Sequence, residues 1–229
     1  MTAEQVFNQA ISAEDAQNWP EAERLYRLLP QVPEACNNLG VIVQRRKDFE
    51  GAASCYAKAV GLSPDYAEAW NNLGSARYEL GELNNALEAL GRACKLGYPQ
   101  AWLNRGICER DLGLLESALE SLRRAPESAE RYAVAGGILH TMGRVDEALE
   151  ALEKALRMEP ASVNGRFNMA LARLSKGDLA AGWRFWEARK DKMGFNRYEL
   201  PEGMWKTTIT FDPRVPLDKR NSLGKTMRP

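Results

Sequence analysis

Small and large apolar residues recur along this chain at fixed distances, and this recurrence is its clearest pattern. Six small residues serve as anchors: Ala22, Ala52, Ala86, Ala118, Ala148 and Gly182. Twelve residues before them stand Ala10, Gly40, Gly74, Gly106, Gly136 and Ala170, and four residues after them stand Tyr26, Tyr56, Leu90, Leu122, Leu152 and Trp186. Six copies in phase predict an internal repeat, in which small residues let two paired helices approach each other closely.

Glycine and proline indicate where the helices of each copy end. Five residues before the anchors stand Gln17, Lys47, Gly81, Gly113, Gly143 and Gly177. A glycine there ends a helix in the left-handed conformation at little cost. Between copies the chain has Pro33, Pro64, Pro99 and Pro160, where proline blocks continuation of a helix. We therefore predict helix-turn-helix repeats over residues 3–32, 33–66, 67–98, 99–128, 129–162 and 163–196.

The repeat resembles the tetratricopeptide repeat. The best copies read AEAWNNLGSARYELGELNNALEALGRA from Ala67 and EACNNLGVIVQRRKDFEGAASCYAKAVGLSP from Glu34. The resemblance implies an all-α, right-handed superhelical solenoid of about six repeats over residues 1–196, followed by an irregular tail over 197–229. Because the anchors stand 30, 34, 32, 30 and 34 residues apart, we expect short second helices or turns near Pro30 and residues 125–127.

Composition narrows the function. Lys plus Arg equal Asp plus Glu at 31 each, so we expect neither nucleic acid nor an anionic membrane as a partner. The N-terminus has no secretory signal or membrane span, which predicts a cytoplasmic protein. The four cysteines stand singly, and His140 is the only histidine, so no metal site or catalytic group is expected. No phosphate-binding loop occurs, and we predict no cofactor and no enzymatic activity.

A column of asparagines is the main candidate for ligand binding. In tetratricopeptide domains the first helix of each repeat lines the inner face, and its sixth position here carries Asn38, Asn72, Asn104 and Asn168, interrupted by Val134. A carboxamide can both donate to and accept from a peptide backbone. The column resembles the asparagine ladder of O-linked N-acetylglucosamine transferases, which holds substrate backbones. The alternative is that these asparagines bond to a neighbouring helix.

Other inner-face positions complete the predicted peptide-binding groove. It adds Asn37, Asn71, Tyr78, Arg110 and Phe167 as candidate contacts. The groove is polar towards the N-terminus and apolar farther on. The apolar part either anchors a ligand segment or is covered by the chain's own tail. Some tetratricopeptide domains clamp a chaperone's terminal carboxylate with lysines and arginines in the groove. This sequence has acids and amides at such positions instead.

The end of the sixth repeat is unusually aromatic. GWRFWEARK places Trp183, Phe185 and Trp186 in one turn, and Pro201 and Trp205 follow. This stretch resembles the junction of bacterial glycosyltransferases that carry N-terminal tetratricopeptide repeats. Three hypotheses follow: an adaptor that binds a protein or peptide in its groove, the substrate-recruiting arm of a glycosyltransferase system, or a scaffold that self-assembles into a homo-oligomer through its aromatic end.

Overall fold

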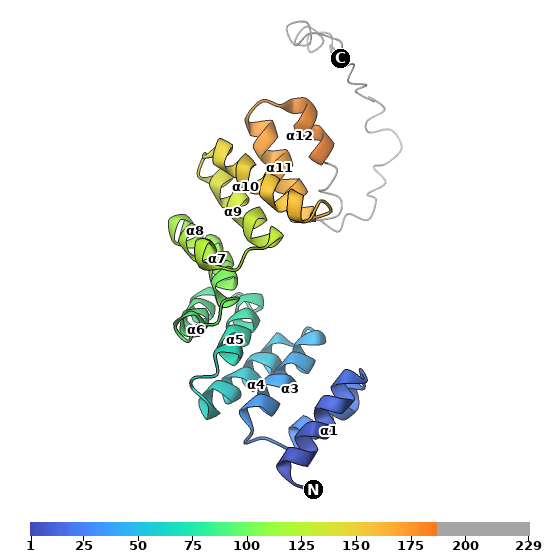
Figure 1. The fold of residues 1–229 in the computed structure, drawn as a ribbon. Coiled ribbons are helices and arrows are strands. Elements are labelled where there is room, and N and C mark those ends of the chain that lie inside the picture. Colours follow the sequence, from blue (N-terminus) through green and yellow to red (C-terminus); the bar gives the residue numbers. More distant parts are fainter. Residues whose placement is uncertain (187–229) are drawn as a thin grey trace, which may run out of the picture. The chain divides into compact units, whose positions relative to one another are not determined.

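The computed structural model describes residues 1–186, and these residues form twelve helices and no strand (Figure 1). The helices pair into six hairpins that follow one another along the chain. Their bounds are α1 (Ala3–Asp15) with α2 (Trp19–Arg27), α3 (Pro33–Arg45) with α4 (Phe49–Leu62), α5 (Ala67–Glu79) with α6 (Leu83–Lys95), α7 (Ala101–Asp111) with α8 (Leu115–Arg124), α9 (Ala129–Thr141) with α10 (Val145–Met158), and α11 (Val163–Ser175) with α12 (Leu179–Trp186). The prediction of an all-α solenoid is confirmed. The predicted tail, with Pro201 and Trp205, lies outside the described residues.

The turn inside each hairpin uses one left-handed residue at the same position. The glycines predicted there, Gly81, Gly113, Gly143 and Gly177, have φ between 75° and 85°. Gln17 and Lys47 adopt the same conformation with φ of 55° and 62°, although a side chain makes it less favourable. The repeat geometry therefore overrides residue preference in the first two hairpins.

Where glycine stands twelve residues before an anchor, as in four of the six repeats, it is needed for close packing. A Cβ on Gly74 would lie 2.6 Å from Leu90 Cγ and 3.2 Å from the carbonyl oxygen of Ala86. A Cβ on Gly136 would lie 2.5 Å from Leu152 Cγ. The closest neighbour is thus the large side chain four residues after the anchor, whereas the sequence pattern indicated the small anchor residue itself.

The core lies between consecutive hairpins as well as within them. One cluster joins Tyr56 of α4 to Leu73 of α5, and another joins Leu122 of α8, Ile138 of α9 and Met169 of α11. Each hairpin therefore depends on its neighbours for burial, as expected of a repeat protein. No helix within residues 1–186 is long and apolar enough to cross a membrane.

The second helices differ in length, as the uneven anchor spacing predicts. Helices α2 and α8 have 9 and 10 residues, whereas α4 and α10 have 14 each. The shortening of α8 ends it at Arg124, and an extended Ala125 follows. This change in helix length lies next to the pocket described below.

Candidate peptide-binding groove

The four column asparagines reach across the seams between hairpins. Asn72 Nδ2 donates to Asn37 Oδ1 at 3.0 Å, and Asn104 Nδ2 donates to Asn71 Oδ1 at 2.9 Å. The other two bond in the same direction along the chain: Asn38 Nδ2 to the Tyr26 hydroxyl at 3.1 Å and Asn168 Nδ2 to the Ala133 carbonyl at 3.0 Å. Each asparagine therefore links its first helix to the preceding hairpin, which is the alternative that the sequence left open.

Asn37 and Asn71 are buried, with 1% and 7% of their surface exposed. Each accepts from the next hairpin through Oδ1, and each donates weakly to the following asparagine at 3.4 Å. Their placement makes them internal links between helices. We therefore leave both out of the ligand contacts proposed below.

The column keeps some hydrogen-bonding capacity for a ligand. Within the described part of the chain, nothing donates a hydrogen bond to the side-chain oxygens of Asn104 and Asn168, and both side chains are half-buried. A carboxamide oxygen accepts up to two hydrogen bonds. These two oxygens can therefore accept from the N–H groups of an extended peptide.

A cavity of about 250 Å³ lies between α5, α6, α7 and the start of α9. Its lining is Ser75, Tyr78, Glu79, Leu90, Asn104, Ile107 and Glu130. Tyr78 and Asn104, predicted separately as contacts, meet here. Leu90 and Glu130 were not among the predicted groove residues. Glu130 was recognisable, because it occupies the same repeat position as Glu34 and Glu68, whereas Leu90 carries only the signature of a core residue.

Tyr78 is held at the edge of this cavity by a charged pair. Its hydroxyl donates to Asp111, and Arg110 Nε donates to Asp111 Oδ1 at 2.7 Å. Burial and the hydrogen bond to Asp111 raise the pKa of Tyr78 to about 12. Burial opposes ionisation of Asp111, but the hydrogen bonds from Arg110 and Tyr78 hold its pKa below the usual value. Asp111 therefore largely neutralises Arg110 and orients the tyrosine.

Phe167 belongs to a different part of the molecule. It stacks on Trp186 with ring centroids 5.8 Å apart, and Trp183 meets Trp186 edge-on at 6.0 Å. His140 Nε2 lies 2.8 Å from the Ser175 hydroxyl. No group of histidine, cysteine and acidic residues suited to a metal ion occurs among residues 1–186.

Family models match most of the described repeats. One, described as TPR repeat, matches residues 45–81, and another, described as Tetratricopeptide repeat, matches 73–133 and 140–182. This chain is a tetratricopeptide-repeat protein. The more specific resemblances, to the transferase ladder and to glycosyltransferase junctions, remain predictions.

Known proteins resemble the chain to different extents. Tetratricopeptide repeat-containing protein trd-1 of Caenorhabditis elegans is 36% identical over 61 residues, which is 27% of this chain and only 8% of that protein. The crystal structure of MamA is 25% identical, with a TM-score of 0.58 over 68% of this chain and 95% of that one. YrrB, described as a TPR protein with an unusual peptide-binding site, is 19% identical, with a TM-score of 0.57 over 72% and 89%. The likeness to YrrB is one of fold.

Proposed function

We propose that this tetratricopeptide-repeat protein is an interaction scaffold that holds an extended segment of a partner protein along its inner helices. The observation that carries the proposal is the cavity of about 250 Å³ at inner-face positions of consecutive hairpins. The cavity combines an apolar floor with an available carboxamide oxygen. Such a combination suits one ligand side chain together with its backbone.

The lining indicates the kind of side chain that would fit. Leu90 and Ile107 are apolar, and the acids Glu79 and Glu130 stand at the same cavity. Neither acid forms an ion pair with another residue of the described chain. A lysine or arginine would place its aliphatic stem on the apolar floor and its charge beside the acids. We infer that the groove prefers a basic residue at this point of the ligand.

The asparagine column has two roles in this proposal. Its nitrogen atoms hold neighbouring hairpins together, which fixes the spacing of the inner helices. The oxygens of Asn104 and Asn168 accept from ligand backbone, and Tyr78 supplies a rigid side-chain contact. YrrB, a TPR protein with an unusual peptide-binding site, agrees with a peptide ligand for this fold.

A photo-crosslinking experiment tests the site. A photoreactive amino acid replaces Ile107 in the cavity or, as a matched control, Glu88, which is exposed on α6. A partner segment that crosslinks to position 107 but not to position 88 is then synthesised as a peptide. Its binding is measured by titration against the wild-type chain and the Ile107→Glu variant. We expect at least tenfold weaker binding by the variant, with an unchanged circular dichroism spectrum. Equal affinity of the two folded proteins would refute the proposed site.

Self-assembly is a second candidate with its own observation. Trp183 on α12 is 54% exposed, although it is a large aromatic residue. Charge at this position should then dissociate an oligomer, so Trp183→Glu is expected to lower the mass measured by light scattering. A wild-type chain that is monomeric at high concentration would exclude this role. The glycosyltransferase junction extends beyond the described residues and stays a prediction.

A further inference from the structure

The seam between the α7–α8 hairpin and the α9–α10 hairpin lacks two features that are present at other seams. Val134 occupies the column position, so α9 has no asparagine to link it back to α7. Within residues 1–186, no side chain of α7 or α8 forms a hydrogen bond with a side chain of α9 or α10. In addition, Ala135 stands where α3 and α5 have Leu39 and Leu73. The seam therefore has less side-chain volume and fewer links. These two features do not by themselves decide whether a seam is open, because the corresponding seam of the first two hairpins has Leu39 and the Asn38 link and still holds a pocket of about 390 Å³.

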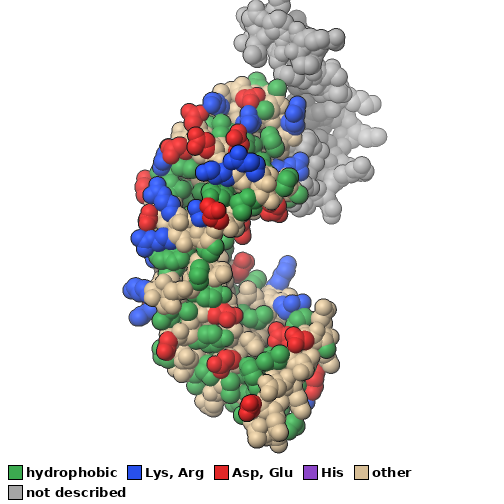
Figure 2. Space-filling view, in the orientation of Figure 1, with side chains coloured by type: hydrophobic (Ala, Val, Ile, Leu, Met, Phe, Trp, Pro, Cys, Tyr) green, Lys and Arg blue, Asp and Glu red, His purple; other side chains and the backbone are tan. Residues whose placement is uncertain are grey.

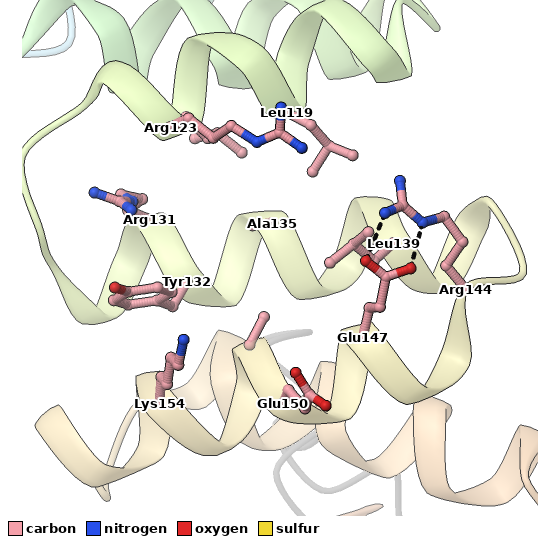
Figure 3. A pocket seen from close by; sticks show the side chains of 12 residues that line it. Leu119, Arg123, Arg131, Tyr132, Ala135, Leu139, Arg144, Glu147, Glu150 and Lys154 are labelled. Atoms are coloured by element: carbon pink, nitrogen blue, oxygen red, sulfur yellow. Dashed lines mark hydrogen bonds and ion pairs between the residues drawn. The ribbon is translucent and has the colours of Figure 1, made fainter.

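A pocket of about 230 Å³ occupies the open seam (Figure 3). We call it the seam pocket. Its lining residues come from α8, α9 and α10 and from the turn before α10: Leu119, Leu122, Arg123, Arg131, Tyr132, Ala135, Leu139, Arg144, Glu147, Glu150, Ala151 and Lys154. Its leucines and alanines supply an apolar floor. The volume is below that of usual small-molecule sites, about 300–1,000 Å³, and suits one or two large side chains.

The ends of the seam pocket differ in charge. At one end, Arg144 donates to both carboxylate oxygens of Glu147, at 2.7 and 2.5 Å, so that pair is neutral (Figure 3). At the other end, Arg131 and Lys154 both lie over the ring of Tyr132, at 4.9 and 5.7 Å from its centroid. The aromatic end therefore carries two positive charges beside an apolar floor, together with the Glu127 carboxylate that accepts from the Tyr132 hydroxyl.

The other groups at the pocket cancel only part of this positive charge. Arg131 Nη1 donates to the Ala125 carbonyl at 2.8 Å, which orients it without neutralising it. Arg123 contacts Glu120 only at 3.4 Å and is 71% exposed. Lys154 forms no ion pair with a described residue. Against Arg123, Arg131 and Lys154 stand two acids that form no ion pair within residues 1–186: Glu150 in the lining, and Glu127 beside it, which accepts a hydrogen bond from the Tyr132 hydroxyl at 2.7 Å. Basic side chains therefore outnumber the unpaired acids by one, and Figure 2 shows basic and acidic side chains interspersed in the middle of the molecule.

We propose that the seam pocket binds a partner segment in which a large apolar side chain is flanked by carboxylates. The apolar side chain enters the space left by Ala135 and rests on Leu119 and Leu139. The carboxylates meet Arg131 and Lys154, both within reach of Tyr132. This site is separate from the inner cavity, whose unpaired Glu79 and Glu130 favour the opposite charge.

Charge separates this occupant from the alternatives. A segment flanked by lysines would bring like charges against Arg131 and Lys154, which opposes binding. A nucleic acid would require a run of phosphate contacts, whereas the pocket offers one short basic end beside Glu150 and the Arg144–Glu147 pair. An acidic and apolar segment satisfies both the floor and the basic end.

The test uses two synthetic peptides as probes, acetyl-DDLFDD-amide and acetyl-KKLFKK-amide. Each is titrated into the full chain, and binding is followed by the NMR chemical shifts of the protein's backbone amides. We expect the acidic peptide to shift the signals of Tyr132 and Ala135 and to bind at least tenfold more tightly than the basic one. Equal binding of both peptides, or shifts confined to other hairpins, would overturn the proposal.

Two variants keep the result independent of folding. Ala135→Leu fills the pocket with the residue that α5 has at this position, so it should weaken the acidic peptide at least tenfold while the melting temperature holds or rises. Lys154→Gln should weaken it severalfold. Ile107→Glu, in the inner cavity, should leave this affinity unchanged. An unchanged affinity in Ala135→Leu, or an equal loss in Ile107→Glu, would refute the site.

Discussion

The seam between the α3–α4 and α5–α6 hairpins and the seam between the α7–α8 and α9–α10 hairpins use the same repeat positions differently. In the first, Leu73 is only 2% exposed and Asn72 donates to buried Asn37. In the second, Ala135 and Val134 stand at these two positions, and a pocket remains. The comparison teaches that two repeat positions can carry a buried leucine and an asparagine link in one seam, and smaller, unlinked residues beside a pocket in another. They are not sufficient to close a seam, because Leu39 also lines a pocket between the first two hairpins.

Exchanging the two seam residues should produce the largest effects on stability. Leu73→Ala removes a buried side chain from the closed seam and should lower the free energy of unfolding by about 3 kcal/mol. Ala135→Leu fills the open seam and should raise it by about 1 kcal/mol. Urea denaturation followed by circular dichroism measures both. If Ala135→Leu stabilises the chain by as much as Leu73→Ala destabilises it, the two seams are packed alike.

The next largest effect on stability should come from the asparagine link in the closed seam. Asn72→Ala removes the donor to Asn37 Oδ1, whose residue is 1% exposed, and should cost about 1–2 kcal/mol because a buried acceptor loses its partner. The exposed residue Asn84 on α6 offers a control, since Asn84→Ala breaks no hydrogen bond that the structure describes. A cost no greater than that of the control would show that the column asparagines do not hold the hairpins.

Much of the fold could be predicted from the sequence, because small residues and turn glycines recur at fixed spacing. The first helices begin at Ala3, Pro33, Ala67, Ala129 and Val163, the same residues that open those repeats in sequence. Helix α7 begins at Ala101 rather than Pro99, because the backbone forms a turn in which Ala101 N donates to the Tyr98 carbonyl. A local turn of this kind leaves no periodic signal.

The candidate sites were less predictable for a different reason. Sequence placed the asparagines on the inner helices, but it could not decide whether each carboxamide faces a ligand or the next helix. That choice depends on partners 12 to 35 residues away, such as Tyr26 for Asn38 and Ala133 for Asn168. Val134 was visible as an interruption of the column, yet the seam pocket next to it, which α8, α9 and α10 line together, became apparent only in the structure.

The turns of the two regions offer a smaller test. Lys47, between α3 and α4, has φ of 62°, whereas Gly143, between α9 and α10, has φ of 75°. Lys47→Gly should raise the free energy of unfolding by about 0.5–1 kcal/mol, because a side chain disfavours this conformation. Gly143→Lys should lower it by a similar amount. If Lys47→Gly is destabilising, a contact of the lysine side chain outweighs the backbone preference.

The smallest expected effect is on the loss of stability at alkaline pH. Burial raises the pKa of Tyr66, next to α5, to about 12, above the value near 10 of an unfolded tyrosine. A folded pKa that is raised contributes stability that is fully present below pH 10 and is lost as pH rises through 12. Tyr66→Phe should therefore lose less stability than the wild-type chain between pH 9 and pH 11 in urea titrations. Tyr132→Phe at the seam pocket gives the comparison, because the pKa of Tyr132 is also raised, chiefly by a hydrogen bond to Glu127 rather than by burial. We expect Tyr66→Phe to reduce the alkaline loss more than Tyr132→Phe does. If both variants reduce the alkaline loss equally, burial in the closed region is not its cause.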